Sequence, residues 1–291
     1  MKPPRFDYYD PRSLEEATRL LQVHQGDCRI LSGGQSLMPL LNMRLARPKV
    51  VLDINRIDGL HDVKLWNDGV AIGAGVRQRA LETDRLIAQR LPLLHTAVEH
   101  LGHPQIRSRG TICGSLAHAD PAAELPALAM ALGAEMVATG PQGNRTITAD
   151  AFYVSYFTTT LAPNEILTEV RFPAPRKDMA WSLLEVSRRH GDFALVGIVA
   201  GMRVDSSRRS IQEARLVYFG VGPTPVRVKE AEEALVGKPP GDSAFQAAAE
   251  KASRQLDPSN DIHASAEYRR SVAGALTRRA LSQAWQKLGG N

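Results

Sequence analysis

Hydrophobic and polar positions alternate through the first 57 residues in a way that predicts strands separated by helices. Three short apolar runs have the length of strands, and two longer stretches repeat their apolar residues at helical spacing. Ser13 begins the first helix, and Glu16 three residues later completes a capping box. The predicted strands are residues 6–8, 29–31 and 50–54, and the predicted helices are residues 14–25 and 37–45.

Residues 58–175 carry two hairpin signals with helices between them. Asp68-Gly69 and residues 140–143 each separate two apolar runs, which predicts a tight turn at each place. Asp120 and Pro121 have the N-cap and first-turn preferences of a helix start, so a helix is expected from Pro121. The other expected elements are helices within residues 83–101 and a strand ending at Phe172, before a proline-rich boundary at residues 173–176.

Three apolar runs followed by two long helical stretches make up the rest of the chain. Strands grouped before helices are typical of an α+β domain. The chain has no internal repeat. The expected strands are residues 181–187, 194–204 and 214–221, and the expected helices are residues 244–256 and 266–288.

Composition narrows the class of protein. Hydrophobic residues make up 43% and charged residues 23% of the 291, which is typical of a globular protein. The longest apolar run has about ten residues, half of what a membrane-spanning helix needs. The N-terminus lacks the apolar stretch of a secretory signal. We therefore expect a cytoplasmic protein with no transmembrane segment.

Charge and cysteine content exclude several kinds of site. The net charge is +5, with 28 Arg and 8 Lys scattered along the chain. Aromatic residues are only 5%, so the basic, aromatic-rich stripe of a nucleic-acid-binding protein is missing and no such partner is expected. Cys28 and Cys113 are too few to hold a structural zinc or an iron–sulfur cluster by themselves.

A glycine loop, Ser32-Gly33-Gly34-Gln35-Ser36, lies between a predicted strand and a predicted helix. Consecutive glycines let neighbouring N–H groups face one ligand, and a helix start adds further donors. The loop has neither the Gly-Lys-Ser/Thr step of a Walker loop nor the Gly-x-Gly-x-x-Gly dinucleotide pattern. By itself it is either a phosphate-binding loop or a plain tight turn.

A second loop of small residues, Thr111-Ile112-Cys113-Gly114-Ser115, also leads into a helix, and Arg107 and Arg109 before it could offset phosphate charge. Two such loops are expected to form the two walls of one dinucleotide groove. The polar residues that follow could ligate a metal, but contacts to ribityl or ribose hydroxyl groups are the favoured interpretation. They are His118, Asp120 and Glu124.

Other motifs carry no function by themselves. The nucleophile motifs of hydrolases are missing, since there is no Gly-x-Ser-x-Gly elbow and no Cys with a recognisable His partner motif. The remaining features are interpreted as surface histidines (His100 and His103), a strand exit (Gly73-Ala74-Gly75) and a turn (Gly191-Asp192-Phe193).

The two loops resemble the flavin loops of the FAD-binding medium subunit of the molybdenum hydroxylases, the family of aerobic carbon monoxide dehydrogenase and the xanthine dehydrogenases. Residues 32–37, followed by Pro39, match the first loop, and residues 109–126 match the second. Further matches, in the same order along nearly the whole chain, are residues 6–8, 191–194 and 265–270.

The resemblance implies an α+β fold in two domains. Residues 1–175 would form a two-part FAD-binding domain of the vanillyl-alcohol-oxidase (PCMH) type, with subdomains of about residues 1–57 and 58–175. Residues 178–288 would form the smaller α+β domain of the carbon monoxide dehydrogenase flavoprotein type, with a three-stranded sheet and helices.

It also implies which residues hold FAD. The loops would bind the diphosphate and the ribityl chain, and Asp120 and Glu124 would lie near the cofactor. Leu167 would lie by the adenine or the ring, and Asp192 and Phe193 would approach the isoalloxazine. The implied set is Ser32, Gly33, Gly34, Gln35, Ser36, Leu37, Thr111, Ile112, Cys113, Gly114, Ser115, His118, Asp120, Glu124, Leu167, Asp192 and Phe193, with no metal ligand and no catalytic residue.

Three positions depart from the family pattern. Cys113 stands where the family often has glycine, and its side chain either crowds the loop or points away from it. Glu185 lies in the stretch where xanthine dehydrogenases carry a lysine. Phe193 lacks the hydroxyl group of the tyrosine in carbon monoxide dehydrogenases.

A member of this family would relay electrons rather than oxidise a substrate itself. A large molybdopterin subunit and a small subunit with two [2Fe–2S] clusters would complete a dimer of heterotrimers. Electrons would pass through non-covalently bound FAD on this chain to an external acceptor. One alternative is a stand-alone FAD-dependent oxidase or dehydrogenase of the same fold acting on a small molecule, and another is a nucleotide-binding scaffold.

Overall fold

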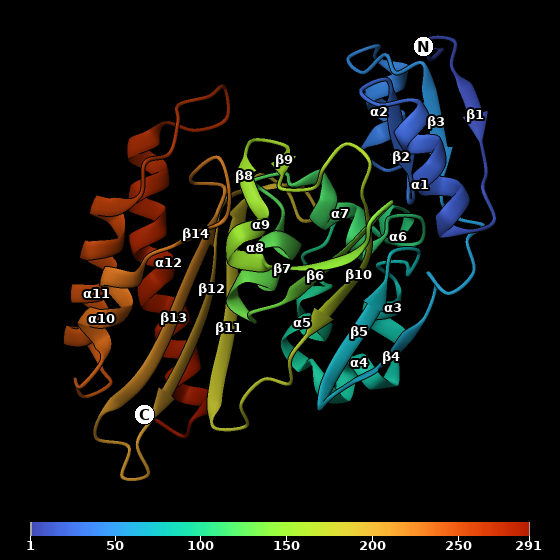
Figure 1. The fold of residues 1–291 in the computed structure, drawn as a ribbon. Helices are drawn as coiled ribbons and strands as arrows, with labels where there is room; N and C mark the ends of the chain where they lie inside the picture. The colour runs from blue at the N-terminus through green and yellow to red at the C-terminus, as the bar shows by residue number, and fades with distance from the viewer. Residues whose placement is uncertain (1, 291) are drawn as a thin grey trace.

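A parallel sheet of three strands forms an N-terminal lobe in the computed structural model, which describes residues 2–290 (Figure 1). The last strand of the lobe lies in the middle, paired in parallel with the other two. Helices connect consecutive strands, because parallel pairing requires a crossover. The elements are β1 (Asp7–Tyr9), α1 (Leu14–Val23), β2 (Cys28–Leu31), α2 (Leu37–Asn42) and β3 (Val50–Asp53).

An antiparallel sheet of five strands follows, built from two hairpins with a later strand between them. In spatial order its strands are β4 (Val63–Trp66), β5 (Gly69–Gly73), β10 (Ile166–Phe172), β6 (Glu135–Gly140) and β7 (Gly143–Thr148). Short helices and a small hairpin fill the rest of this region: α3 (Ala80–Thr83), α4 (Arg85–Arg90), α5 (Pro92–Ala97), α6 (Pro104–Arg107), α7 (Ile112–His118), α8 (Glu124–Ala131), α9 (Ala149–Phe152), β8 (Tyr153–Ser155) and β9 (Thr158–Thr159).

The C-terminal part is an antiparallel sheet followed by helices, as the α+β pattern predicts. Its three long strands confirm the prediction, and a two-residue fourth strand is added at the edge. The strands are β11 (Met179–Ser187), β12 (Ala194–Val204), β13 (Ile211–Phe219) and β14 (Val226–Arg227). The helices are α10 (Lys229–Leu235), which the sequence analysis missed, α11 (Asp242–Gln255) and α12 (Ala266–Lys287).

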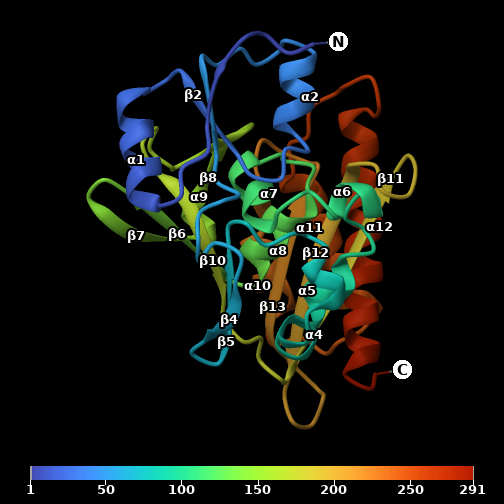
Figure 2. The same ribbon diagram turned by 90° about the vertical axis from the view of Figure 1, so that its right-hand side faces the viewer.

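The C-terminal sheet is buried on both faces, and this joins the two parts of the molecule (Figures 1 and 2). α8 packs on β12 and β13 from one side, where Val199 and Val217 join the core of the first 175 residues. α12 packs on β11 and β12, and Ile198 and Leu216 on the opposite face belong to a second core with the C-terminal helices. No helix among residues 2–290 combines the length and apolar content needed to span a bilayer.

The first helix and both hairpin turns form as predicted. Ser13 Oγ accepts a hydrogen bond from the Glu16 N–H at 3.2 Å. The second half of the capping box differs, because the Glu16 carboxylate accepts from the Arg12 N–H and not from Ser13. Asn67 adopts a positive φ of 52° in the turn between β4 and β5, as a tight hairpin requires.

Three predicted boundaries were wrong. The helix expected from Pro121 begins at Glu124, because the Asp120 carboxylate accepts from the Ala122 N–H and closes a turn instead of capping a helix. The second loop ends early, since Thr111 is a helix N-cap and residues 112–115 form the first turns of α7. The helix expected over residues 37–45 ends at Asn42.

Candidate cofactor-binding site

The two predicted loops meet between the N-terminal lobe and the five-stranded sheet. Ser32 Oγ lies 2.9 Å from Thr111 Oγ1 and 3.2 Å from the Ala74 carbonyl oxygen. A Cβ on Gly33 would lie 2.6 Å from the Arg109 carbonyl oxygen and 2.8 Å from the Thr111 nitrogen. Those neighbours are backbone atoms that cannot rotate away, so only glycine lets the two segments approach this closely.

The amides of the glycine loop, residues 32–37, have no protein acceptor. Within residues 2–290, none of these six N–H groups donates to a backbone or side-chain oxygen. All six residues are partly exposed, and Gly34 has a positive φ of 74°. Successive free N–H groups around a residue of positive φ form a concavity that binds anions. The loop therefore fits a phosphate or diphosphate group.

In the second segment, residues 111–115, three of the five N–H groups have acceptors, and those of Thr111 and Cys113 have none among the described residues. Thr111 Oγ1 accepts from the Gly114 N–H at 3.1 Å, and the Thr111 carbonyl oxygen accepts from the Ser115 N–H at 3.1 Å. The Ile112 N–H donates to the Val76 carbonyl oxygen at 3.2 Å. This segment is a rigid wall against which the glycine loop packs.

Cys113 points away from the loops. Its side chain is buried in the core, and its Sγ lies 3.6 Å from the Ile72 carbonyl oxygen. Burial raises the pKa of the thiol well above its ordinary value. Of the two outcomes open for this position, crowding of the loop is therefore wrong.

A third segment, residues 73–79, runs along both loops and was missed in the sequence analysis. Besides the Ala74 and Val76 contacts, the Gln78 N–H donates to the Gly110 carbonyl oxygen at 2.8 Å. The pattern of small residues at 73–75 was interpreted only as a strand exit. Residues 73–75 do leave strand β5, and the backbone of residues 73–79 continues beneath both loops as the floor segment.

Asn55 and Arg77 were also missed, and both touch the loops. Asn55 Nδ2 donates to the Ser32 carbonyl oxygen at 2.9 Å. Arg77 Nη2 donates to Asn55 Oδ1 at 2.7 Å, and Arg77 Nη1 donates to the Arg109 carbonyl oxygen at 2.6 Å. A polar residue just after a buried strand was the one signal available for Asn55.

The cation expected from Arg107 is not available to a phosphate group. Its guanidinium pairs with Glu82 and donates to the carbonyl oxygens of Leu101 and Gly102. Arg109, in contrast, is exposed beside the loop. The prediction for Arg107 was therefore wrong, because the side chain fixes the turn before α6 instead.

His118, at the end of α7, and the acidic residues that follow it do not form a metal site in the described part of the chain. The His118 ring lies against Phe157 with 5.1 Å between centroids, and burial lowers the pKa of His118. Glu124 is 5% exposed, and burial raises its pKa to about 8, with Glu185 and Asp120 adding to the shift. Glu124 is thus protonated at neutral pH and offers a neutral hydrogen-bonding group.

The turn of residues 191–193 lies against the segment before α6. A Cβ on Gly191 would lie 2.6 Å from the His103 ring, and Phe193 is 59% exposed. Nearby, His100 Nδ1 lies 3.4 Å from Glu185 Oε1, and hydrogen bonding to Glu185 raises the pKa of His100. His100 is therefore a half-buried partner of Glu185 and not the surface residue that was expected.

Leu167 is buried within the five-stranded sheet. It is 4% exposed on β10 and pairs with Ala138 of β6. The carbonyl oxygen of the next residue, Thr168, accepts from the Ala74 N–H at 2.9 Å, which places Leu167 beside the floor segment. No backbone hydrogen bond joins residues 191–193 to residues 32–37 among the described residues, so the structure ties the two loops to each other but not to the turn.

Two family descriptions match this chain in succession. Residues 4–175 match the FAD binding domain in molybdopterin dehydrogenase, and residues 181–284 match the CO dehydrogenase flavoprotein C-terminal domain. The chain is 42% identical over 284 residues to 6-hydroxypseudooxynicotine dehydrogenase complex subunit alpha of Paenarthrobacter nicotinovorans, covering 98% of this chain and 96% of that protein. It is 37% identical over 287 residues to the carbon monoxide dehydrogenase medium chain of Hydrogenophaga pseudoflava, covering 99% of each.

Solved structures give the same result. A chain of carbon monoxide dehydrogenase from Hydrogenophaga pseudoflava superposes with a TM-score of 0.95 at 38% identity, covering 99% of both chains. A chain of quinoline 2-oxidoreductase from Pseudomonas putida 86 superposes with a TM-score of 0.94 at 36% identity, covering 99% of both. As the resemblance of its loops indicated, this chain belongs to the family of FAD-binding medium subunits of molybdenum hydroxylases.

Proposed function

We propose that this chain is the FAD-binding subunit of a molybdenum-containing dehydrogenase or hydroxylase complex, an oxidoreductase in which it relays electrons to an external acceptor. The observation that carries the proposal is the row of six free amides at residues 32–37, seated against the Thr111 segment. A diphosphate is the part of FAD that such a row of donors binds best.

The residues of this chain bind and orient the cofactor, while FAD itself supplies the redox chemistry when bound. Residues 32–37 hold the diphosphate, and residues 111–115 keep that loop in place. Protonated Glu124 can donate a hydrogen bond without placing a second negative charge beside the phosphates. The exposed ring of Phe193 is free to cover the isoalloxazine from the C-terminal part. The full set of seventeen residues inferred from the sequence remains the proposed site.

The proposed partners are a large molybdopterin subunit and a small subunit with two [2Fe–2S] clusters, assembled as a dimer of heterotrimers. Relatives of this chain are named as subunits or medium chains of dehydrogenases, including a nicotine 6-hydroxylase medium subunit. The proposed domains are residues 1–175 and 178–288. A cytoplasmic location stays a prediction from the sequence.

Flavin binding tests the proposal directly. The purified chain, mixed with FAD and passed over a desalting column, is expected to retain flavin absorbance near 450 nm in about one-to-one amount. Fluorescence quenching then gives the dissociation constant. A chain that retains no flavin, although folded by circular dichroism, would contradict the proposal.

Activity of the separate chain distinguishes the complex from a stand-alone oxidase. The flavin-loaded chain is expected to accept electrons from dithionite but not from small organic substrates, because the proposed function leaves substrate oxidation to the molybdopterin subunit. Affinity purification of the natively expressed chain is expected to recover a molybdenum-containing and an iron–sulfur-containing subunit. Substrate-dependent flavin reduction by the chain alone would favour the oxidase instead.

A further inference from the structure

The peptide groups on both sides of the loop contact are fixed by one pair of side chains. Asn55 Nδ2 holds the Ser32 carbonyl oxygen at 2.9 Å, and Arg77 Nη1 holds the Arg109 carbonyl oxygen at 2.6 Å. The second of these oxygens is the atom that a Cβ on Gly33 would approach to 2.6 Å. The hydrogen bond between Arg77 and Asn55, at 2.7 Å, joins the two anchors into one bridge.

Asn55 is itself held from the strand side. Its main-chain N–H donates to Asp53 Oδ1 at 2.8 Å, and its side-chain Nδ2 donates to the same oxygen at 2.5 Å. Tyr8 donates to the other oxygen of the same Asp53 carboxylate at 2.7 Å. The amide group of Asn55 therefore has little freedom to rotate, and Arg77 is anchored to the N-terminal lobe through it.

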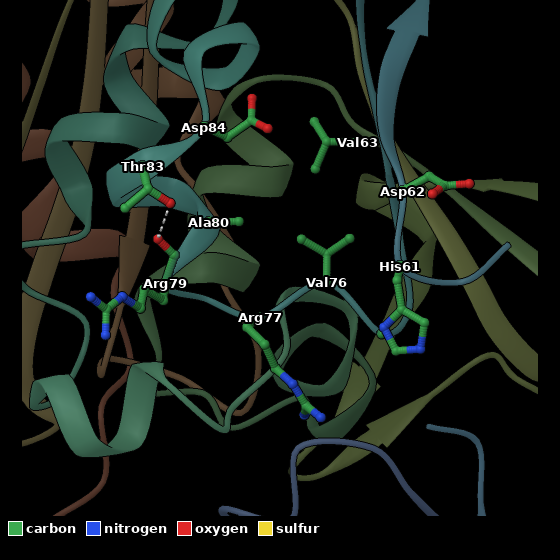
Figure 3. A pocket seen from close by; sticks show the side chains of 10 residues that line it. His61, Asp62, Val63, Val76, Arg77, Arg79, Ala80, Thr83 and Asp84 are labelled. Carbon is green, nitrogen blue, oxygen red and sulfur yellow. Dashed lines mark hydrogen bonds between the residues drawn. The ribbon is translucent and has the colours of Figure 1, made fainter. Parts of the chain in front are cut away.

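Arg77 also carries a charge that no salt bridge neutralises among the described residues, although the charge of Asp53 stabilises it. Both of its hydrogen bonds go to neutral oxygens, and within residues 2–290 no carboxylate lies at ion-pair distance from it. It lies at the edge of a hollow of about 510 Å³, and its guanidinium points away from Thr83 and Asp84, toward the chain of the N-terminal lobe (Figure 3). A half-buried, unpaired cation beside free amides raises the positive potential at an anion site.

We propose that Arg77, acting with Asn55, is a positioning residue that holds the glycine loop against residues 109–111 and makes the site selective for a diphosphate-bearing flavin. The inference rests on the proposed FAD-binding function. Arg77 suits this task better than lysine would, because a planar guanidinium can reach two oxygens on different segments at once.

The structure predicts a specific change in ligand preference. Loss of the bridge lets the two loops separate, which weakens the grip on two linked phosphates but not the contacts to the flavin ring. The affinity for FAD is expected to fall, whereas the affinity for FMN, which has one phosphate and no diphosphate, is expected to change little. A general loosening of the fold would weaken both ligands alike.

Fluorescence quenching of the purified full chain with FAD and with FMN tests this. Arg77→Met is expected to raise the Kd for FAD about 30-fold, which corresponds to about 2 kcal/mol, and to change the Kd for FMN less than threefold. Asn55→Leu, which keeps the charge but breaks the bridge, is expected to raise the Kd for FAD about tenfold. ADP, competing with FAD, is expected to lose affinity in parallel with FAD.

Arg79→Met is the matched control, because Arg79 lines the same hollow, is exposed and makes no side-chain hydrogen bond in the described chain. It is expected to bind FAD as the wild type does. If Arg77→Met fails to fold, Arg77→Lys replaces it, and urea unfolding checks that this variant is folded. Its affinity for FAD is expected to fall by an intermediate factor of about ten. Unchanged FAD affinity, or equal losses for FAD and FMN, would overturn the inference. A wild-type chain that binds no FAD overturns the proposed function as well.

Discussion

The two walls of the candidate site, residues 32–37 and residues 111–124, meet at one contact but differ in how many N–H groups they leave without an acceptor. The glycine loop of residues 32–37 leaves every N–H free and is partly exposed throughout. The helical wall, residues 111–124, uses three of the five N–H groups of residues 111–115 for bonds to itself and to the floor segment, and its Cys113 and Glu124 side chains are buried. The glycine loop offers six free N–H groups to a ligand, whereas residues 111–115 offer two and give the glycine loop a fixed surface.

This difference indicates which wall contributes more hydrogen-bond donors to an anion. A donor already bonded to a protein oxygen has nothing left to offer, whereas an unbonded exposed amide gains a charge-assisted hydrogen bond when an anion arrives. The walls meet at Gly33, because the Arg109 backbone occupies the space that a side chain at this position would need. Changes at the contact are therefore expected to have larger effects on binding than changes within the helical wall.

Of the substitutions considered, Gly33→Ala is expected to weaken FAD binding the most. The new Cβ would meet backbone atoms at 2.6 to 2.8 Å, so the loops must separate. The Kd for FAD is expected to rise at least 100-fold, which is about 2.7 kcal/mol. Overpacking is also expected to cost about 1–3 kcal/mol of stability. Flavin titration and urea unfolding measure the two effects.

Gly26→Ala is the control for Gly33→Ala. Gly26 has a positive φ of 82°, but a Cβ added to it would meet no atom within 4 Å, and the residue lies in the turn between α1 and β2. Alanine there is expected to cost about 1 kcal/mol of stability through backbone strain, with no change in FAD affinity. Equal FAD affinity of Gly33→Ala and the wild type would show that close approach of the walls is unnecessary.

Glu124→Gln tests the protonation state of the buried carboxyl group in the helical wall through the pH dependence of stability. Burial raises the pKa of Glu124 to about 8 from 4.5, so the folded chain holds a proton that the unfolded chain releases. The associated stability is complete below pH 4.5 and is lost as pH rises through about 8. Since glutamine cannot ionise, the variant is expected to be more stable than the wild type by about 4 kcal/mol at pH 8 and by only about 1 kcal/mol at pH 5.

Urea unfolding at the two pH values measures the Glu124 effect. Glu233→Gln is the matched control, because Glu233 is exposed and its replacement is expected to leave the pH dependence unchanged. If the difference in unfolding free energy between the wild type and Glu124→Gln were the same at pH 5 and at pH 8, Glu124 would be ionised in the folded state.

Patterns that repeat along the chain were predictable, and isolated contacts were not. Strands, hairpin turns and the two glycine-bearing segments each involve several residues whose spacing carries a signal. Arg77 and Asn55 act as single residues, and their function depends on which carbonyl oxygens the fold brings within reach. Asp120 shows a second limit, since the same side chain caps a helix or closes a turn with nearly the same local sequence.

Cys113→Ala is expected to have the smallest effect on binding. The Sγ lies in the core beside the Ile72 carbonyl oxygen and not at the loop contact, so the Kd for FAD is expected to stay within twofold of the wild type. Stability is expected to fall by about 1 kcal/mol through lost packing, and the native thiol is expected to resist Ellman's reagent because it is buried and its pKa is raised. A change in FAD affinity above fivefold would place the thiol at the binding face and would remove the distinction between a recognising wall and a supporting wall.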